Sequence, residues 1–456
     1  MSTLRQPNPV EFPPVMTIAG SDSGGGAGIQ ADLKTMEALE TFATSAVTSL
    51  TAQNTVGVES IHPVPVAEVT AQIDAIRDDF ALRAVKTGML GVRPVVETVT
   101  SYAAEMDVPF VVDPVMVAAS GDRLLDRDAE AAYEGLIAES TVVTPNADEA
   151  EILTGIPIAD PDSMRRAGRR LTEMGATAAL IKGGHVGDGQ PVRDVVVTQE
   201  DVTTVRHPRV DSDATHGSGC TLSSAIAARL AHGDDVPDAI EAGITFMTRA
   251  IRYPLDIGHG PGAVHHLVDV RNRSAGRSTQ EAVESIVQQF VSTDVSPIVP
   301  EVGMNVVGAL PYAERPGETV AVEGRIAKTM DGVRTARGTR FGASSHVARL
   351  LLSAREHDPE IRFGTNLRFD ASIETALEGI DATVVEVDRS KEPDPNEDGS
   401  TMGWVADRAF ERAETAPVAV FDRGGVGKEP ITRLLTANAD DLMTDALSVV
   451  EALRNY

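Results

Sequence analysis

The stretch Ile18-Ala-Gly-Ser-Asp-Ser-Gly-Gly-Gly-Ala-Gly-Ile-Gln-Ala-Asp32 joins a β-branched run to the start of a helical pattern. One frame within it, Gly26 to Ala31, matches the dinucleotide-binding fingerprint with Ala in the last slot. The three consecutive glycines exceed what that fingerprint needs, because only the last of them belongs to the frame. The stretch therefore predicts a strand, a tight turn and a helix, and the turn is either a dinucleotide site or purely structural.

Around this stretch, up to about Val268, short β-branched runs alternate with helical patterns. This alternation predicts parallel strands with crossover helices in an α/β sandwich. A second, smaller α/β pattern follows from Glu301 to Tyr456 and ends in a helix at 439–453. The runs expected to form strands are VMTIAG (15–20), FVVDPV (110–115), TVVTP (141–145), AALIKGG (178–184), DVVVT (194–198), MNVVGAL (304–310), TVAVEGRIA (319–327), ATVVEVD (382–388) and PVAVFD (417–422).

A polar segment separates the two patterns. Residues 269–277 carry no hydrophobic period and are interpreted as a linker. Ser278 and Glu281 then have the spacing of a capping box, and apolar residues recur at helical spacing behind them. We therefore divide the chain into a first domain at 1–268, a linker with the start of a connecting helix at 269–284, and a second domain at 285–456.

The charge balance limits the classes of partner. Asp and Glu number 68 against 40 Lys and Arg, which gives a formal net charge of −28 over 456 residues. A nucleic-acid-binding protein needs a basic surface, so nucleic acid is excluded as a main partner. Only six of the basic residues are Lys, and an acidic, Lys-poor surface is typical of a halophilic protein. In such a chain each Lys is itself a candidate site residue.

Targeting signals and cysteines point to the cytoplasm. The first residues lack the apolar core of a signal peptide, and no run of 18 apolar residues predicts a membrane span. Cys220 is the only cysteine, so an intrachain disulfide cannot form. We expect a cytoplasmic protein that acts on small molecules and does not bind membranes.

A second glycine motif, Asp213-Ala-Thr-His216-Gly-Ser-Gly-Cys220, leads into a helical pattern. Glycines at a helix start expose backbone N–H groups, and the helix dipole adds positive charge there. The motif therefore predicts a cradle for a phosphoryl group, with an ordinary helix cap as the alternative. A third run, Gly424 to Lys428, is not a P-loop, because Asp422 and Glu429 occupy positions where that motif requires Gly and Ser or Thr.

The first domain resembles a known family. AGSDSGGGAGIQADLKT, LTAQNT, KTGML, TPNADEAEIL, IKGGH, THGSGCT and GHGPG occur in one order between Met16 and Val268. Together they are similar to the hydroxymethylpyrimidine and hydroxymethylpyrimidine-phosphate kinase of thiamine biosynthesis. The resemblance implies a ribokinase-like three-layer α/β/α sandwich, two successive phosphorylations with Mg²⁺ and ATP, and a homodimer. Pyridoxal kinase activity is a weaker alternative, since the folds are shared.

The resemblance also assigns residues around the phosphates. Cys220 is the catalytic candidate, either as a base whose pKa is lowered by the helix N-terminus or as a thiol that shapes the anion hole. Glu149 resembles the family's magnesium residue, in an Asn-x-x-Glu spacing with Asn146. The remaining ATP or phosphate candidates are Asp113, Asn146, Lys182, His216, Gly217, Ser218 and Gly219.

Five further residues are implied in binding the pyrimidine. The two polar residues, Asp32 and Gln53, can hydrogen-bond an aminopyrimidine edge. The two apolar residues, Met89 and Val115, supply contact surfaces, although Met and Val are more often core residues. The five candidates are Gly20, Asp32, Gln53, Met89 and Val115.

The second domain carries VGMNVVGALPYA, VEGRIAK, FGASSHVAR, DPEIRFGTNLRFD, DRSKEP, GSTMGWV and DRGGVGKEP. This set resembles an archaeal-type thiamine-phosphate synthase domain, which joins the pyrimidine diphosphate to thiazole phosphate. The implied catalytic residues are Arg325 and His346, and the implied substrate contacts are Ser344, Lys391 and Lys428. The alternative is a regulatory domain that binds thiamine phosphate and has no synthase activity.

Overall fold

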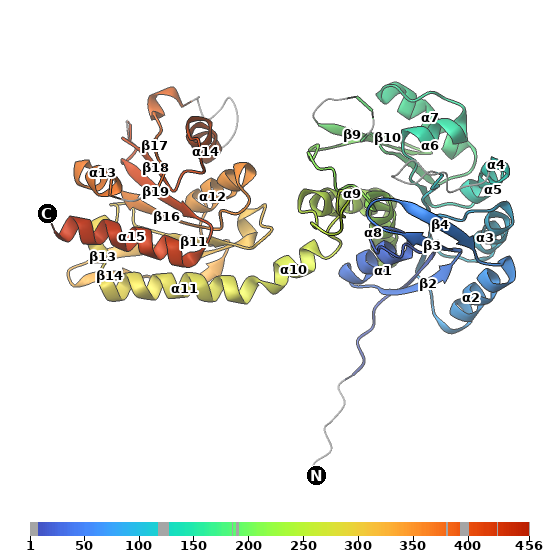
Figure 1. Ribbon diagram of the computed structural model, residues 1–456, viewed down its shortest axis with the longest axis horizontal. Coiled ribbons are helices and arrows are strands. Elements are labelled where there is room, and N and C mark those ends of the chain that lie inside the picture. The colour runs from blue at the N-terminus through green and yellow to red at the C-terminus, as the bar shows by residue number, and fades with distance from the viewer. Residues whose placement is uncertain are drawn as a thin grey trace, which may run out of the picture. The chain divides into compact units, whose positions relative to one another are not determined.

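The computed structural model describes residues 8–116, 127–184, 186–187, 191–379, 382–392, 401–425 and 427–455. The chain divides into two compact units, Met1–Val268 and Asp269–Tyr456 (Figure 1). Among the described residues, no helix combines the length and apolar character that crossing a membrane requires.

The first unit is built on an eight-stranded sheet with the order β10-β9-β8-β7-β6-β5-β1-β2. Six neighbouring strands are parallel, and β9 and β10 continue the sheet antiparallel. The strands are β1 (Pro14–Ala19), β2 (Phe42–Val47), β5 (Ala84–Thr87), β6 (Phe110–Val112), β7 (Val142–Val143), β8 (Ala178–Ile181), β9 (Val192–Thr198) and β10 (Val202–His207).

Helices cover both faces of this sheet, and each face has its own aliphatic core (Figure 1). Three layers result, so the predicted α/β/α sandwich is confirmed. One face carries α1 (Gly28–Ala38), α8 (Ser218–His232) and α9 (Val236–Arg252). The other carries α2 (Val66–Asp79), α3 (Arg93–Glu105), α4 (Arg127–Glu130), α5 (Tyr133–Ala138), α6 (Ala147–Thr154) and α7 (Pro161–Glu173).

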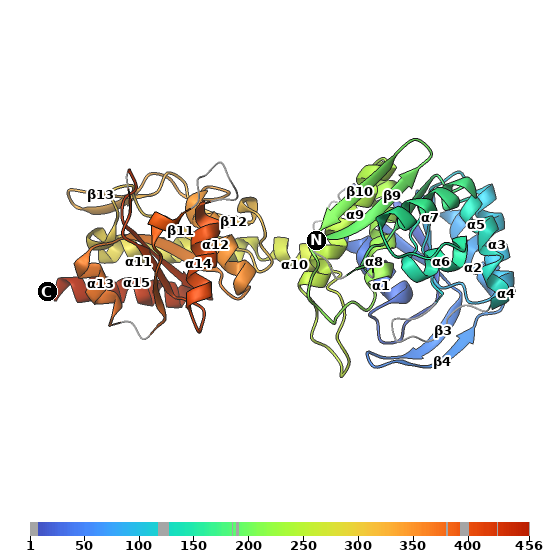
Figure 2. The same cartoon turned by 90° about the horizontal axis from the view of Figure 1, so that it is seen from above.

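An antiparallel hairpin, β3 (Ser49–Gln53) with β4 (Val58–Pro63), stands apart from the main sheet of the first unit (Figure 2). Leu50 and Ile61 of this hairpin are exposed. Gln53 ends β3 and is thereby held at the edge of the unit's large cavity.

The second unit contains a seven-stranded sheet with the order β15-β12-β11-β16-β19-β18-β17 and a separate hairpin of β13 and β14. All neighbours in the sheet are antiparallel except β17 and β18. The strands are β11 (Val306–Ala309), β12 (Thr319–Val322), β13 (Ile326–Thr329), β14 (Gly332–Thr335), β15 (Thr339–Phe341), β16 (Phe363–Arg368), β17 (Val384–Glu386), β18 (Ala419–Asp422) and β19 (Ile431–Thr436).

This second sheet is also packed on both faces. One core joins it to α11 (Gly276–Thr293), α13 (Ala371–Leu377) and α15 (Ala439–Arg454), and the other to α12 (His346–His357) and α14 (Thr401–Arg412). Short 3₁₀ turns complete the unit at Ser296–Ile298, Pro316–Glu318 and Arg389–Lys391. The prediction of a smaller α/β unit is confirmed.

The segment 269–277, which was expected to be an irregular linker, is mostly helical: α10 (Val268–Ser274) occupies most of it and α11 starts at Gly276. A buried contact overrides the missing hydrophobic period. Asn272 donates through Nδ2 to Glu318 at 3.1 Å and accepts the N–H of Tyr312 at 2.9 Å. Ser278 lies inside α11 and donates to the carbonyl of Ala275, so it does not cap the helix.

Candidate active sites

A cavity of about 1050 Å³ opens in the first unit at the ends of several parallel strands. In parallel α/β sheets this edge is the usual place for a ligand. It gathers segments that lie far apart in the sequence: the turn after β1, the end of the β3 strand, and the residues after β5, β6, β7 and β8. All first-domain candidates named above line this cavity except Asp32.

The start of α8 forms the phosphate cradle of this cavity. Gly217 is the N-cap with φ +83°, and no side chain caps the first turn. A Cβ on Gly217 would lie 1.9 Å from the carbonyl oxygen of Gly26, so only glycine fits between the two glycine motifs. A Cβ on Gly219 would lie 3.5 Å from both Asp113 and Lys182. Asp113 and Lys182 therefore lie close to the first turn of α8.

Asp113, Glu149 and Lys182 form a charged group beside this cradle. Nζ of Lys182 lies 3.3 Å from Oδ1 of Asp113 and 3.9 Å from Oε2 of Glu149. Burial, with a contribution from Asp113, raises the pKa of Glu149 to about 7 despite the neighbouring Lys182. Although burial opposes its charge, Asp113 and Glu149 raise the pKa of Lys182. Two carboxylates that repel one another are suited to receive a divalent cation.

Asn146 and Glu149 form a capping box at the start of α6. Asn146 accepts the N–H of Glu149 at 2.9 Å, and Glu149 accepts the N–H of Asn146 at 2.8 Å. The spacing that resembles a magnesium motif thus also has a local structural function. It fixes one carboxylate oxygen and aims the group at the cavity. Among the described residues, no cluster of three or more His, Cys, Asp or Glu forms a complete cage for a metal.

Cys220 lies in the first turn of α8 and lines the cavity. Burial raises the pKa of its thiol to about 12, despite the ammonium of Lys86, and the carboxylates of Asp32 and Asp113 add to the increase. The expectation of a lowered pKa is therefore wrong for the unliganded chain. Burial outweighs Lys86 and the backbone N–H of Gly28, which both act to lower the pKa of this thiol.

Asp32 does not contact the cavity, in contrast to its expected role in binding the pyrimidine. Its side chain is fully buried beneath the floor of the site and is occupied by other partners. The two carboxylate oxygens accept from Lys86 at 2.8 and 2.9 Å, from Thr17 at 2.6 Å and from Ser224 at 2.8 Å. A carboxylate with this many donors has little capacity left for a substrate.

The apolar pyrimidine candidates are placed close together. The N–H of Gly20 donates to the carbonyl of Met89 at 3.1 Å. A Cβ on Gly20 would lie 2.6 Å from Cε of Met89, so the glycine leaves space for this side chain. Val115 lines the same cavity two residues after Asp113. These three residues thus line one cavity, and their role in binding the pyrimidine stays a prediction.

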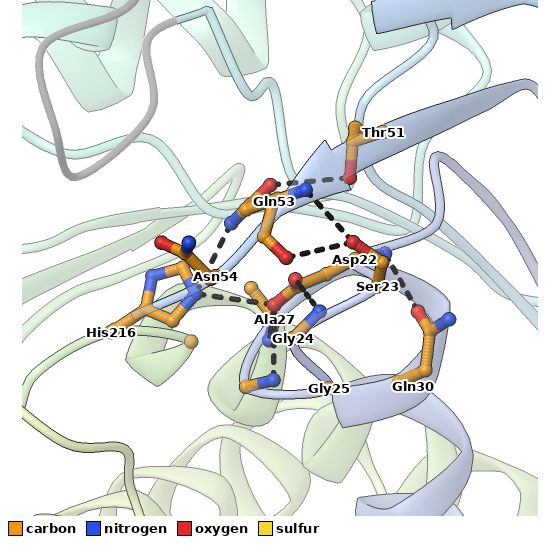
Figure 3. Close-up of polar contacts among 12 residues, drawn as sticks. Asp22, Ser23, Gly24, Gly25, Ala27, Gln30, Thr51, Gln53, Asn54 and His216 are labelled. Atoms are coloured by element: carbon orange, nitrogen blue, oxygen red, sulfur yellow. Dashed lines mark hydrogen bonds and ion pairs between the residues drawn. The ribbon is translucent and has the colours of Figure 1, made fainter. Parts of the chain in front are cut away.

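Gln53 and His216 meet above the turn that follows β1 (Figure 3). Nε2 of His216 lies 3.2 Å from Oδ2 of Asp22 and 3.3 Å from the side-chain amide of Gln53. Asp22 is 2% exposed and also accepts backbone N–H groups of Gly24, Gly26 and Ala27. His216 thus joins the two glycine motifs.

In the second unit, Arg325 and Lys428 lie near the same edge of the sheet. Arg325, at φ +79°, donates to the carbonyl of Val302. Glu429, the residue after Lys428, accepts the N–H groups of Glu301 and Val302 at 2.7 and 3.2 Å. Arg325 and the Lys428 loop are therefore joined through residues 301–302.

Ser344 and His346 come after β15 and lie near the first residue of β12. The N–H of Gly342 donates to the carbonyl of Thr319, the first residue of β12, whereas Arg325 comes after its last residue. The four residues of β12 span about 10 Å. His346 is exposed at the start of α12, and Ser344 is buried two residues before it. The two catalytic candidates, Arg325 and His346, thus lie near opposite ends of β12.

The Lys391 and Lys428 motifs lie together, but only one of the lysines points at the other motif. Lys428 donates to Glu392 at 2.9 Å, while Lys391 is exposed and lies 3.7 Å from Asp388. Glu392 also contacts Arg389, whose guanidinium lies 3.3 Å from Asp422. A buried ionic network with an excess of cations results, since Arg433 lies 2.7 Å from Asp422 as well.

Two segments of the chain match known protein families. Residues 22–265, more than half of the chain, match the family described as phosphomethylpyrimidine kinase. The chain belongs to the phosphomethylpyrimidine kinase family. Residues 282–448 match a second family, thiamine-phosphate synthase ThiN. The resemblances drawn from the motifs of both domains are confirmed.

Curated relatives support the assignment of the first unit to this kinase family. The hydroxymethylpyrimidine/phosphomethylpyrimidine kinase of Haemophilus influenzae is 45% identical over 259 residues, which cover 55% of this chain and 96% of the relative. That of Streptomyces coelicolor is 47% identical over 265 residues, 58% of this chain and 98% of the relative. The thiamine biosynthesis bifunctional protein ThiED of Geobacter sulfurreducens is 47% identical over 267 residues, 57% of this chain and 54% of the relative.

Solved structures share the fold of the kinase unit. An ADP complex of Bacillus subtilis pyridoxal kinase aligns with a TM-score of 0.54 and 32% identity, over 57% of this chain and 100% of that one. Staphylococcus aureus pyridoxal kinase in complex with AMP-PCP and pyridoxal aligns with a TM-score of 0.53 and 29% identity, over 57% and 96%. The ribokinase-like fold is thereby established for the first unit.

Two buried residues of the kinase site were given no specific role from the sequence. Lys86 lines the cavity and Asp22 holds its glycine-rich turn. A signal for Lys86 existed, because it is one of only six lysines and lies in the motif KTGML. For Asp22 the sequence offered only its place within the first glycine motif.

Proposed function

We propose that this kinase phosphorylates hydroxymethylpyrimidine and then its monophosphate, and that the second unit couples the resulting diphosphate to thiazole phosphate. The observation that carries the first part is the cavity that combines the open start of α8 with Asp113, Glu149 and Lys182. The match of residues 282–448 to a thiamine-phosphate synthase family supports the second part.

In the kinase unit, the N–H groups of Gly217 and Gly219 receive the γ-phosphoryl group of ATP, whereas the N–H of Ser218 is donated to the carbonyl of Thr215. The substrate hydroxyl oxygen forms the new bond to phosphorus as the bond to the ADP oxygen breaks, and the hydroxyl proton passes to an oxygen of the transferred phosphoryl group. Lys182 neutralises charge on the transferred group as a point charge. The backbone cradle and this ammonium lie on one side of the cavity, while Gln53, Met89 and Val115 orient the pyrimidine.

Mg²⁺ fits the donor set beside the cradle. Glu149 and Asp113 would hold it, with Asn146 fixing the orientation of Glu149 through the capping box. A bound Mg²⁺ would neutralise charge on the phosphate oxygens. One or two carboxylates with phosphate oxygens and waters are what this ion ordinarily requires.

Cys220 shapes the phosphate cradle and does not act as the catalytic base. A thiol with a pKa near 12 holds its proton at neutral pH. Replacement by Ser, which keeps a small polar group, would then preserve most of the activity. A base would instead show a loss of about 10²- to 10⁴-fold in both Ser and Ala variants.

In the second unit, the nitrogen of thiazole phosphate attacks the methylene carbon of the pyrimidine diphosphate. A carbon–nitrogen bond forms, and the carbon–oxygen bond breaks with its electron pair leaving on diphosphate. Cations are needed where that charge develops. Arg325 and Lys428 supply them at one edge of the sheet, while Ser344 and His346 are available to bind or protonate a group at the other end of β12.

The alternative for the second unit is a regulator that binds thiamine phosphate without catalysis. Arg325→Ala and His346→Ala separate the two functions. A synthase would lose thiamine phosphate formation in these variants while the kinase rate stays unchanged. If thiamine phosphate formation survives both substitutions, the assignment of the synthase residues is wrong.

The substrate of the kinase also needs a direct test, since pyridoxal kinases share the fold. Values of kcat/KM for hydroxymethylpyrimidine and pyridoxal decide it, and a clear preference for pyridoxal would overturn the proposal. The homodimer through the kinase unit stays a prediction, and the molar mass of the protein in solution would test it. Halophily stays a prediction, and a melting temperature that does not rise with KCl would contradict it.

The experiment that tests the whole proposal is a one-pot assay in high KCl. It contains Mg²⁺, ATP, hydroxymethylpyrimidine and thiazole phosphate, and both ADP and thiamine phosphate are quantified. Both products together support two working sites on one chain. ADP without thiamine phosphate favours the regulatory alternative, and folded protein that makes neither product contradicts the proposed substrates.

A further inference from the structure

The carboxylate of Asp22 is fixed from several directions (Figure 3). Oδ1 accepts the N–H of Gly24 at 2.8 Å, and Oδ2 accepts the N–H groups of Gly26 at 3.0 Å and Ala27 at 2.7 Å. Burial opposes the charge of Asp22, but the hydrogen bonds from His216 and from the N–H groups of Ala27 and Gly24 lower its pKa. An ionised carboxylate can only accept hydrogen bonds.

This fixes the proton on His216. Its Nε2 lies 3.2 Å from Oδ2 of Asp22, so Nε2 must carry a hydrogen that it donates to the carboxylate. The amide atom of Gln53 that lies 3.3 Å from the same Nε2 must then be an acceptor. His216 thereby requires that the carbonyl oxygen of Gln53 faces it.

Thr51 leads to the same orientation independently. Its hydroxyl hydrogen is donated to the carbonyl of Ser21 at 2.8 Å, so its oxygen is left to accept. The other amide atom of Gln53 lies 3.4 Å from this oxygen and must be the nitrogen. Exchanging the oxygen and nitrogen of the Gln53 amide drawn in Figure 3 satisfies both neighbours.

The backbone of Gln53 is held as firmly as its side chain. The hydroxyl of Ser23 donates to the carbonyl of Gln53 at 2.7 Å and accepts its N–H at 2.8 Å. The ring of His216 has room only because residue 26 is glycine, where a Cβ would lie 2.8 Å from Cδ2 of the ring. Residues 22–26 therefore present Gln53 to the cavity in one conformation.

An amide of fixed orientation presents a donor and an acceptor side by side. This pair is complementary to an aromatic ring nitrogen next to an exocyclic amino group, as in the pairing of Gln with adenine. An amide turned the other way would offer the same two groups in reversed order. The orientation consequently selects which edge of an aminopyrimidine is bound.

We propose that His216, held by Asp22, is a positioning residue that fixes the amide of Gln53 for recognition of the aminopyrimidine edge. The proposal rests on the proposed assignment of Gln53 to the pyrimidine site. It moves His216 from the ATP phosphates, where the sequence placed it, to the acceptor side of the cavity. His216 acts through Gln53 and takes no part in the transfer itself.

A double-mutant cycle tests this with His216→Phe, Gln53→Ala and the combined variant of the full-length chain. His216→Phe should raise KM for hydroxymethylpyrimidine about tenfold, as expected when a binding group is misplaced, with KM for ATP within about twofold of the parent. The combined variant should be no worse than Gln53→Ala alone, because the histidine acts through the glutamine. His216→Gln, which keeps a side-chain N–H, should recover part of the loss. Calorimetric binding of ADP confirms that each variant is folded.

The outcomes are distinguishable. A raised KM for ATP with an unchanged KM for hydroxymethylpyrimidine would return His216 to the phosphates. Additive losses in the combined variant would show that His216 acts independently of Gln53, and either result overturns the inference alone. If Gln53→Ala leaves KM for hydroxymethylpyrimidine unchanged, the proposed pyrimidine site fails and the inference fails with it.

Discussion

Lys86 and Asp32 form an ion pair in which neither side chain is exposed, with Nζ 2.8 and 2.9 Å from the two carboxylate oxygens. Lys86 comes from β5 and Asp32 from α1. Asp32 also accepts from Thr17 of β1 and Ser224 of α8. Ser224 lies one turn after Cys220, so the pair anchors the helix that carries the phosphate cradle to the central sheet.

The first prediction concerns this pair. Asp32→Asn should destabilise the kinase unit by about 3–5 kcal/mol, because it leaves the ammonium of Lys86 buried without a counter-charge. Adding Lys86→Met should recover part of the loss, since no lone charge then remains. Urea unfolding followed by circular dichroism measures both changes.

The chain provides an internal control for that measurement. Trp404 is its only tryptophan and packs in the second unit. Its fluorescence transition should stay in place in both Asp32 variants. A combined variant that is less stable than Asp32→Asn alone would show that the charge pairing is not what the buried pair contributes.

How far the sequence predicted the kinase site depended on the kind of residue. Gly217 and Gly219 were predictable because few reasons other than backbone geometry place glycines at a helix start. Asp32 was misplaced because a carboxylate on a helix looks the same in sequence whether it faces substrate or a buried lysine. That choice depends on β1, β5 and α8 meeting at one point, which is a property of the folded chain.

The second prediction is that Cys220 reacts slowly with iodoacetamide in the native protein. Burial raises the pKa of its thiol to about 12, so the reactive thiolate is scarce at pH 8. Alkylation should be at least about tenfold slower than for free cysteine and should keep rising with pH beyond pH 9. Because Cys220 is the only cysteine, the mass of the intact chain reports it alone.

Unfolded protein in urea is the control for this reaction, and it should react like free cysteine. The native protein should react more slowly because a raised pKa keeps the thiol protonated over the whole neutral range. A native alkylation rate that levels off below pH 9 would show that Lys86 and the start of α8 outweigh burial.

The third prediction concerns Gly217, which has φ +83° and faces the carbonyl of Gly26 at a distance that excludes a Cβ. Gly217→Ala should push the two glycine motifs apart and lower kcat by about 10²-fold, since the cradle is displaced from the transferred group. Gly57→Ala is the matched control, because a Cβ there would meet nothing within 4 Å. Both variants are compared by steady-state kinetics. An equal kcat in Gly217→Ala and Gly57→Ala would contradict the role of this close approach.

In the second unit the sequence recognised motifs but not their partners. The two Lys-Glu-Pro repeats suggested two equivalent phosphate contacts, yet Lys428 pairs with Glu392 while Lys391 is exposed. Arg389 and Arg433 were not singled out, because nothing local distinguishes them from the other 32 arginines of the chain. Their shared partner, Asp422, becomes visible only when the ends of β18 and β19 are paired.

The fourth prediction tests that network. Asp422 is fully buried and lies 2.7 Å from Arg433 and 3.3 Å from Arg389. Asp422→Asn removes the carboxylate that two buried guanidinium groups share and should destabilise the second unit by about 3–5 kcal/mol. The fluorescence transition of Trp404 should move to lower urea, and ADP formation from hydroxymethylpyrimidine should be unchanged. Asp407→Asn, on an exposed residue of α14, is the control, because an exposed ion pair contributes about 1 kcal/mol or less. Equal shifts in the two variants would mean that the Asp422 network does not stabilise this unit through its charges.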